Sequence, residues 1–442
     1  MQMMSYGERW QRAHTWFYGT LIISLSILLI GWWLNSGHSL ALPGGRLMAI
    51  GRLFGLLAAF SILFEVVLMS RLTLIDKYFD LQEIVDLHRL TGFAVLFGIA
   101  GHIGFLVVGY AALNSVGLWH QFLNFNTHFA DVFRATLGTA VFAVVIGLST
   151  KKLRAKLPHE VWYFLHLTLY GAILLTFGHQ LNTGADFIAQ PWFAAYWYVL
   201  YGGVFVTLVW FRFLRPLITY LRHGFVVESV KPEASGIYSV IITGRDIAKY
   251  KYEPGQYARW HILTPKLWYQ AHPFSFSGPA GEAKLRFTVK APSGDFSQQI
   301  PNIKPGTRVI IDGPRGAFVA GRADDAKRVI LIAGGIGVAP YMSTVQALLD
   351  KGKQVVILYA ARTAAEVAFR DELLYLQKIG VRIKLYLGDQ GQRIDQSVLE
   401  PLVDDDTAVF LCGPDSMSQA LGQSLRQAGL PASRIISERF AF

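Results

Sequence analysis

The chain has 442 residues, 52% of them hydrophobic, and its 41 lysines and arginines exceed its 30 aspartates and glutamates, giving a formal charge of +11. This length exceeds what one domain usually contains, and the single cysteine, Cys412, excludes an internal disulfide. The positive charge comes without a basic-aromatic platform or reader motif, which argues against a nucleic-acid partner and leaves attraction to anionic lipid as the simpler explanation.

Six apolar stretches in the first half are long enough to cross a hydrocarbon core of roughly 30 Å, which takes about 20 helical residues. They lie near Trp16–Leu34, Ala49–Met69, Leu87–Tyr110, Phe129–Leu148, Val161–Leu181 and Ala194–Phe213. We therefore expect a six-helix transmembrane bundle over residues 16–214, preceded by a short cytoplasmic N-terminus at residues 1–15.

Basic side chains predict the orientation of these stretches, because loops rich in Lys and Arg stay in the cytoplasm. The loop at Lys151–Lys156 reads KKLRAK, and the N-terminus and the loops near Arg71 and Arg212 add charge on the same side. The opposite loops carry little beyond Arg46. We expect a multi-pass protein of the cell (inner) membrane with both termini in the cytoplasm.

Four histidines lie inside these apolar stretches: His88 and His102 in the third, and His166 and His179 in the fifth. Ionisable residues are expensive in lipid, so each is a functional candidate, and neutral imidazole is a common axial ligand of haem iron. The spacings of 14 and 13 residues correspond to roughly 21 and 20 Å along a helix. We expect His88 to face His166, and His102 to face His179, as ligands of two stacked haems.

Helix geometry leaves one difficulty, because thirteen residues turn a straight helix by about 140°. The fifth stretch then needs a bulge, a bend or different side-chain reach, and a satisfied polar histidine facing the bundle interior remains the alternative for each position. Arg89 follows His88 and is a candidate to pair with a haem propionate, or else an interfacial snorkelling arginine. Glu65 in the second stretch has no assigned role beyond lining a polar path.

Short alternating strands separated by Gly and Pro begin near Phe225, which predicts a small antiparallel β-barrel over residues 222–321. Within it, AHPFSFSGP at Ala271–Pro279 places small hydroxyls and His272 on extended backbone, a pattern suited to a flavin edge and its phosphates. Strand hydroxyls and an ordinary surface histidine are the alternatives.

The next segment, KAPSGDFSQQI, starts at Lys290 and indicates a turn that leads into a short helix. Its Gly294, Phe296 and Ser297 would present helix N-terminal amides to a phosphate, which makes the segment a cofactor-binding candidate. An ordinary helix cap explains the same letters.

Strand–helix alternation begins near Arg328, which predicts an α/β domain with a parallel, nucleotide-binding sheet over residues 326–442. AGGIGVAP at Ala333–Pro340 follows a strand and opens a helix, and its glycines let backbone amides approach a pyrophosphate. Arg362 ends the next strand, where an acid usually holds the ribose of NAD. An arginine there favours the 2′-phosphate of NADPH, with NADH still possible and a solvated loop charge as the alternative.

The motifs AHPFS, SGDFS, AGGIGVAP and FLCGPDSM, in this order, resemble those of the ferredoxin–NADP reductase family. With four histidines ahead of them, the chain is similar to the ferric reductase and NADPH oxidase superfamily, and most similar to its single-chain bacterial NADPH oxidases. The resemblance runs from about Ala49 to the terminus. It implies two b-type haems, an inner one held by His88 and His166 and an outer one held by His102 and His179.

The resemblance also implies which residues bind the other cofactors. FAD would be bound by His272, Pro273, Phe274 and Ser275; the NAD(P)H pyrophosphate by Gly334, Gly335, Gly337 and Pro340; and the nicotinamide would be flanked by Cys412, Gly413 and Pro414. Phe442, with Phe440 as second choice, would stack on the flavin ring, so Cys412 and Phe442 are the residues expected at the reacting rings. Arg315 departs from the family, which often has an aromatic residue there.

Hydride transfer from NAD(P)H delivers two electrons and haem iron takes one, so a flavin must stand between them. The predicted path runs from NADPH through FAD and both haems to an outside acceptor, which is dioxygen in the leading interpretation, giving superoxide. Reduction of ferric chelates is the alternative, although the outer segment Leu113–Thr127 is apolar and has no charge cluster for a chelate. A haem-binding membrane subunit without reductase activity is disfavoured by the intact motifs. We expect no obligatory protein partner.

Overall fold

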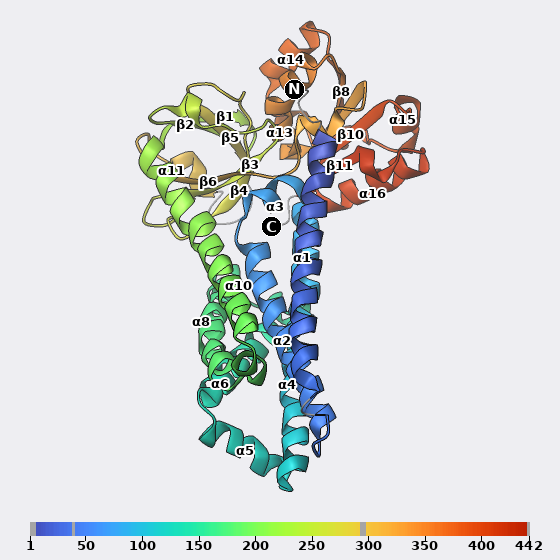
Figure 1. The fold of residues 1–442 in the computed structure, drawn as a ribbon. Helices are drawn as coiled ribbons and strands as arrows, with labels where there is room; N and C mark the ends of the chain where they lie inside the picture. Colours follow the sequence, from blue (N-terminus) through green and yellow to red (C-terminus); the bar gives the residue numbers. More distant parts are fainter. Residues whose placement is uncertain (1–5, 38–39, 292–297, 440–442) are drawn as a thin grey trace. The chain divides into compact units, whose positions relative to one another are not determined.

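A computed structural model of the chain describes residues 6–37, 40–291 and 298–439 (Figure 1). The chain divides into two compact units. The helical unit consists of Thr15–Leu72 and Leu81–Phe211, and the sheet unit consists of Met1–His14, Thr73–Asp80 and Arg212–Phe442. The short segment at residues 73–80 therefore belongs with the sheet unit, although it lies between two long helices along the chain.

Long apolar helices make up most of the helical unit. The described helices of this unit, long and short, are α1 (Tyr6–Ser36, which begins in the sheet unit), α2 (Gly45–Met69), α4 (Leu81–Asn114), α5 (Leu118–His128), α6 (Val132–Leu148), α7 (Lys151–Arg154), α8 (His159–Thr183), α9 (Ala185–Ala189) and α10 (Pro191–Val209). Among the described residues, five helices are long and apolar enough to cross a membrane, and α5 with α6 is a sixth candidate whose halves meet at 113°. The six-helix count stays a prediction.

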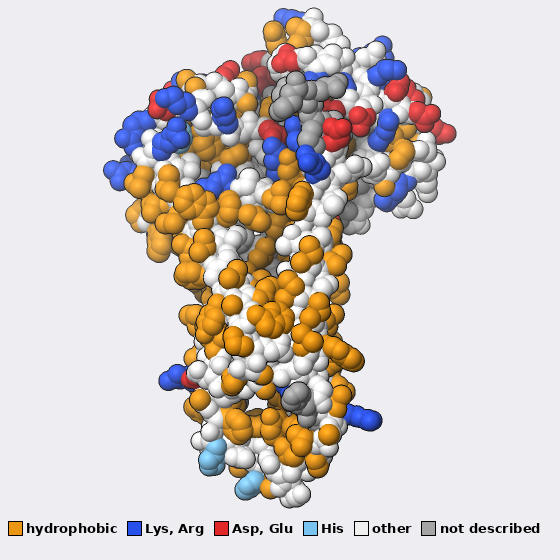
Figure 2. Space-filling view, viewed as in Figure 1, with side chains coloured by type: hydrophobic (Ala, Val, Ile, Leu, Met, Phe, Trp, Pro, Cys, Tyr) orange, Lys and Arg blue, Asp and Glu red, His pale blue; other side chains and the backbone are white. Residues whose placement is uncertain are grey.

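Large apolar side chains cover the outside of these helices (Figure 2). Trp33, Phe97, Leu174 and Val199, which come from four different helices, are each more than 70% exposed. Contiguous exposed apolar surface of this kind is unfavourable in water and suits a lipid environment. The chain is therefore a multi-pass membrane protein.

Small residues bring the helices of this unit close together. α2 packs along α4, and α6 packs along α8. A Cβ atom added at Gly98 of α4 would lie 2.8 Å from Cβ of Ala58, and one added at Gly138 of α6 would lie 3.0 Å from the backbone oxygen of Ala172. Such small-residue contacts are typical of helices that associate within a membrane.

Antiparallel strands form the first part of the sheet unit, as the alternating pattern predicts. β1 (Val226–Ala234), β2 (Ile237–Thr243) and β5 (Leu285–Lys290) form one three-stranded sheet, and β3 (Tyr257–Ile262), β4 (His272–Ser275) and β6 (Val309–Arg315) form another. Isolated bridges at Val226–Arg308 and Phe276–Phe287 link these segments further. Inward-facing apolar residues, including Trp260 and Phe287, fill the space between the strands.

A five-stranded parallel sheet, in the order β11-β10-β7-β8-β9, forms the second part. Its strands are β7 (Arg328–Gly334), β8 (Gln354–Ala361), β9 (Arg382–Leu387), β10 (Thr407–Gly413) and β11 (Ile435–Arg439), and the helices of this part are α13 (Ala339–Asp350), α14 (Arg370–Lys378), α15 (Gln396–Leu399) and α16 (Asp415–Gln427). β7 alternates between two core clusters, with Leu331 in one and Ile332 in the other. This explains its unbroken apolar sequence, because both faces of a parallel sheet are covered.

The segment at residues 73–80 contains α3 (Thr73–Tyr78) and binds the antiparallel strands through charge pairs. Arg315 forms ion pairs with Asp76 and with Asp312, and its side chain is 5% exposed. The backbone nitrogen of Gly316 donates to the backbone oxygen of Asp76 at 3.0 Å, and Arg322 Nη1 lies 2.8 Å from Asp80. Arg315 therefore anchors α3. Another helix of the sheet unit, α11 (Arg215–His223), follows α10 after a π-helical turn.

Candidate functional site

The two predicted histidine pairs come together in the helical unit. The ring centroids of His88 on α4 and His166 on α8 are 6.0 Å apart, and those of His102 and His179 on the same two helices are 6.3 Å apart. α8 is α-helical throughout His159–Thr183. The azimuthal offset of a 13-residue spacing is therefore not compensated by a bulge in α8, which leaves a bend or different side-chain reach.

Both separations fit two imidazoles on opposite sides of one iron. Metal–nitrogen bonds are about 2 Å long, so ring centroids about 6 Å apart leave room for one metal ion between two imidazoles. Among the described residues no group of three or more His, Cys, Asp or Glu could hold a metal ion. A metal at these pairs must therefore bring further ligands with it, as the iron of a haem does.

The surroundings of the second pair, His102 and His179, fix the orientation of one ring. His102 Nδ1 lies 2.9 Å from the backbone oxygen of Gly51. A carbonyl can only accept, so Nδ1 donates and Nε2 is the nitrogen that could bind a metal. Gly55 makes room for this ring, because a Cβ atom there would lie 2.4 Å from Nδ1.

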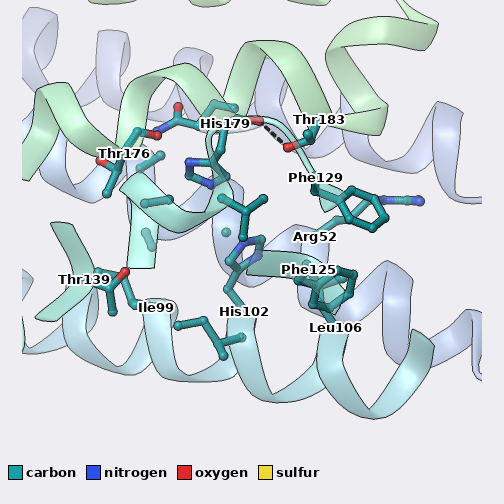
Figure 3. Close-up of a pocket in the computed structure, with 18 of the residues that line it drawn as sticks. Arg52, Ile99, His102, Leu106, Phe125, Phe129, Thr139, Thr176, His179 and Thr183 are labelled. Carbon is teal, nitrogen blue, oxygen red and sulfur yellow. Dashed lines mark hydrogen bonds between the residues drawn. The ribbon is translucent and has the colours of Figure 1, made fainter. Parts of the chain in front are cut away.

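A pocket surrounds this second pair, and Figure 3 shows both imidazoles pointing into it. Apolar side chains form most of its wall, including Ile99, Leu106, Phe125 and Phe129. An apolar wall with two convergent polar groups is typical of a cofactor site and suits the flat hydrophobic face of a macrocycle.

Arg52 on the wall of this pocket was missed by the sequence analysis. Its Nε lies 3.4 Å from Asp186 Oδ2, and Asn35 donates to Asp186 Oδ1 at 2.9 Å. The available signal was a basic residue inside the stretch Ala49–Met69, since charges within apolar helices are rare and usually functional.

The first pair, His88 and His166, has a different environment. The carboxylate of Glu65 on α2 contacts His88 Nδ1, and the hydroxyl of Thr91 donates to the same carboxylate. On the other side, the Trp162 ring stacks on His166 with centroids 5.1 Å apart. Glu65, which the sequence left without a role, thus lies directly behind a candidate ligand.

Arg89 lies at the surface of α4 in this structure. Its Nη1 is 3.4 Å from Asp86 Oδ1, and both side chains are more than half exposed. Its pairing with a haem propionate stays a prediction.

In the antiparallel part, the predicted flavin segment is the strand β4. His272 begins β4, with Nε2 3.2 Å from Gln270 Oε1, and its ring stacks on that of Phe274. Pro273 pairs with Arg259 of β3 across the sheet, and Ser275 is buried. Gly294, Phe296 and Ser297, together with Phe440 and Phe442, lie outside the described residues.

The glycine-rich loop after β7, at residues 334–337, and the turn after β10 meet at the carboxyl edge of the parallel sheet. A Cβ atom added at Gly337 would lie 2.0 Å from the backbone oxygen of Cys412, and one added at Gly334 would lie 2.8 Å from Cδ of Pro414. Gly335 has a φ of +56° and Pro340 lies in the first turn of α13. β7 and β10 are neighbours where the strand order reverses, which is the usual ligand position in such sheets.

Cys412 and Glu438 face each other across β10 and β11 at this edge. Cys412 is fully buried, and burial raises the pKa of its thiol well above the ordinary value, so it remains neutral. Burial, with a smaller contribution from Asp80, raises the pKa of Glu438 to about 8. Sequence analysis missed Glu438 because its burial depends on strands distant in the chain.

Two predicted cofactor residues share one carboxylate. Lys290 Nζ lies 2.7 Å from Glu366 Oε2, and Arg362 Nη2 lies 3.0 Å from Glu366 Oε1. The Arg362 side chain is 73% exposed just after β8, whereas that of Glu366 is 17% exposed. An arginine held this way is accessible to a ligand.

Three family models match consecutive parts of the chain. "Ferric reductase like transmembrane component" matches residues 54–177, "FAD-binding domain" matches 236–319, and "Oxidoreductase NAD-binding domain" matches 331–423.

Curated relatives match about half of this chain. Flavohemoprotein A of Dictyostelium discoideum is 28% identical over 239 residues, which are 49% of this chain and 59% of that protein. The reductase component of propane 2-monooxygenase from Mycolicibacterium goodii is 27% identical, over 48% of this chain and 66% of that protein. The chain thus spans less than two thirds of the length of these relatives.

Among solved structures, a ferredoxin NADP+ reductase from Neisseria gonorrhoeae with bound FAD and NADP is similar over 49% of this chain and 98% of that one, with 17% identity and a TM-score of 0.45. Phthalate dioxygenase reductase is similar over 51% of this chain and 70% of that one, with 23% identity and a TM-score of 0.45.

Proposed function

We propose an electron path for this chain, a transmembrane NAD(P)H-dependent flavin oxidoreductase whose matched domains fit the ferric reductase and NADPH oxidase superfamily. It passes electrons from NADPH through FAD and two haems b to dioxygen on the outer face of the membrane, releasing superoxide. The observation that carries this proposal is that two histidine pairs in apolar helices have ring centroids 6.0 and 6.3 Å apart. When bound, the flavin accepts a hydride and gives up single electrons, which haem iron accepts one at a time.

The residues of the sheet unit bind and orient the two nucleotides in this proposal. The backbone amides of Gly335 and Gly337 approach the NADPH pyrophosphate at the start of α13. The turn after Cys412 borders the nicotinamide, Arg362 binds the 2′-phosphate, and β4 from His272 onward borders the flavin.

The residues of the helical unit hold the irons and exclude water. With two histidines on each iron, no ligand position would stay open for the acceptor, and the haems would supply one-electron transfer only. We assign His88 and His166 to the inner haem, with Arg89 near a propionate, and His102 and His179 to the outer haem. This assignment rests on the predicted positive-inside topology, in which both termini are cytoplasmic.

The pocket around the outer pair favours a small neutral acceptor. Phe122, Phe125 and Phe129 line it, and an apolar aromatic wall gives no compensation for the desolvation of a charged chelate. Arg52 on the same wall favours the second candidate, reduction of an anionic ferric chelate by the same path.

The test measures superoxide directly. The purified full chain, loaded with FAD and haem, receives NADPH in air while cytochrome c reduction is followed with and without superoxide dismutase. We expect dismutase to inhibit the reduction, and a His102→Leu variant to abolish the inhibitable part. Dismutase-insensitive reduction, with ferric chelates reduced in the absence of oxygen, would instead support the metalloreductase.

A further inference from the structure

We propose that Glu65 is a positioning residue that gives the His88–His166 iron a lower reduction potential than the His102–His179 iron, so that electron transfer between them is downhill. This inference rests on the proposed function, because it requires two haems. It concerns the two histidines of α4, His88 and His102, whose Nδ1 atoms meet different partners.

The two sites differ in the charge of the group that contacts the histidine Nδ1 atom. His88 Nδ1 contacts the carboxylate of Glu65, whereas His102 Nδ1 lies 2.9 Å from the neutral backbone oxygen of Gly51. A ligating histidine usually donates its other N–H to such a partner, and the partner sets the basicity of the ring. A carboxylate makes the imidazole a stronger electron donor than a carbonyl does.

Contacts with two side chains of α4 hold the Glu65 carboxylate beside His88. The Glu65 side chain is 13% exposed, and α2, on which it lies, packs along α4. The hydroxyl of Thr91 donates to its carboxylate and also lies 2.9 Å from the backbone oxygen of Leu87. A carboxylate in an apolar helix is costly, and contacts with Thr91 and His88 compensate for that cost.

The expected consequence is a potential difference with a defined sign. A more basic ligand and a nearby negative charge both favour the oxidised iron, and the groups that contact the ligating histidines are a recognised means of tuning haem potentials. One electron leaves the first iron, which is oxidised, and enters the second, which is reduced, with no bond formed or broken. NADPH supplies the electron under the proposed function.

The position of Glu65 along the chain supports this direction. His88 lies eight residues after Asp80, the last residue of the segment that belongs to the sheet unit, whereas His102 lies a further fourteen residues on. Under the topology of the proposed function, in which the first residues of α4 face the cytoplasm, the carboxylate lies at the inner iron site. Making this site the weaker oxidant drives electrons toward the other one.

The test is a spectroelectrochemical titration of both haems in the full chain, with electron paramagnetic resonance of the oxidised protein as a second readout. We expect Glu65→Gln to lower the equilibrium constant for transfer from the first iron to the second about tenfold, equivalent to raising one midpoint potential by about 59 mV. The other potential should not change. Glu65→Asp, which keeps the charge, should restore most of the difference.

Thr91→Val provides an independent variant if Glu65→Gln fails to fold. Removing the hydroxyl leaves the carboxylate charge less compensated, so the same potential should shift in the opposite direction. Two bound haems whose potentials are unchanged in Glu65→Gln, or shift equally, would overturn the inference and leave the proposed function standing. Absence of haem from the wild-type chain would instead contradict the proposed function.

Discussion

The candidate site of the sheet unit is formed mainly by backbone atoms, whereas that of the helical unit is formed by side chains. In the sheet unit the site is made of backbone, because Gly334 and Gly337 bring main-chain atoms within a distance that no side chain permits. In the helical unit the site is made of side chains, because four imidazoles project from two regular helices toward one another. The backbone site should therefore be damaged by adding atoms, and the histidine sites by removing them.

The strongest test of this contrast removes an imidazole. His102→Leu should abolish binding of one haem and all transfer to the outside acceptor, while NADPH still reduces the flavin at the wild-type rate. Haem content by pyridine haemochrome and stopped-flow flavin reduction measure the two effects separately. Loss of both haems would show that the irons do not bind as independent pairs.

The next largest effect is expected when one methyl group is added to the glycine-rich loop of the sheet unit. Gly337→Ala would place Cβ 2.0 Å from the backbone oxygen of Cys412, and overpacking of this kind costs about 1–3 kcal/mol. We expect NADPH-dependent flavin reduction to weaken by about 10- to 100-fold, with haem content unchanged. The matched control is Gly352→Ala, where a Cβ atom meets nothing within 4 Å but φ is +72°, so it tests backbone strain alone. Equal losses in the two variants would contradict a specific role for the contact.

A smaller effect is expected from Arg362, a side chain of the candidate nucleotide site in the sheet unit. Arg362→Ala should raise the KM for NADPH about tenfold, because a charge-assisted hydrogen bond is worth about 1.5–3 kcal/mol and this side chain is largely exposed. The KM for NADH should not change. Lys327→Ala, which removes an exposed lysine paired with Asp406, should affect neither value. Equal changes for both nucleotides would exclude binding of the 2′-phosphate.

The smallest expected effect is on stability and concerns a partly buried acid, Glu438. The pKa of Glu438 is raised to about 8 from an ordinary value of 4.5, so the folded state holds a proton there that the unfolded state has released. Stability should therefore be greatest below pH 4.5 for this group and fall as the pH rises through 8. Thermal inactivation temperatures at pH 6 and pH 8.5 should differ for the wild type and differ less for Glu438→Gln.

Sequence patterns predicted the parts of the molecule that depend on neighbours along the chain. The alternating strands, the parallel sheet after Arg328 and the superfamily resemblance are confirmed by the fold and by the three matching domains. The histidine pairing also followed from spacing, since a helix converts residue number into distance. Whether these histidines bind haem stays a prediction.

The parts that sequence could not predict are contacts between distant residues. Glu65 and His88 are on different helices, and Arg315 meets Asp76 from 239 residues away. Similarly, the apolar stretch at Phe129–Leu148 contains no feature that reveals the 113° angle at which α5 meets α6. Hydropathy identifies the segments that prefer lipid, but it does not predict which polar side chains on different helices contact each other.

The attachment of residues 73–80 to the sheet unit has a consequence for recombination between related proteins. Asp76 and Asp80 pair with Arg315 and Arg322, so a segment inserted between two membrane helices is electrostatically matched to strands encoded much later in the gene. A chimera that exchanges only the part after Arg212 would separate these partners and bury an unmatched guanidinium. Inheritance of the reductase half as a cassette therefore requires a second, eight-residue piece to travel with it.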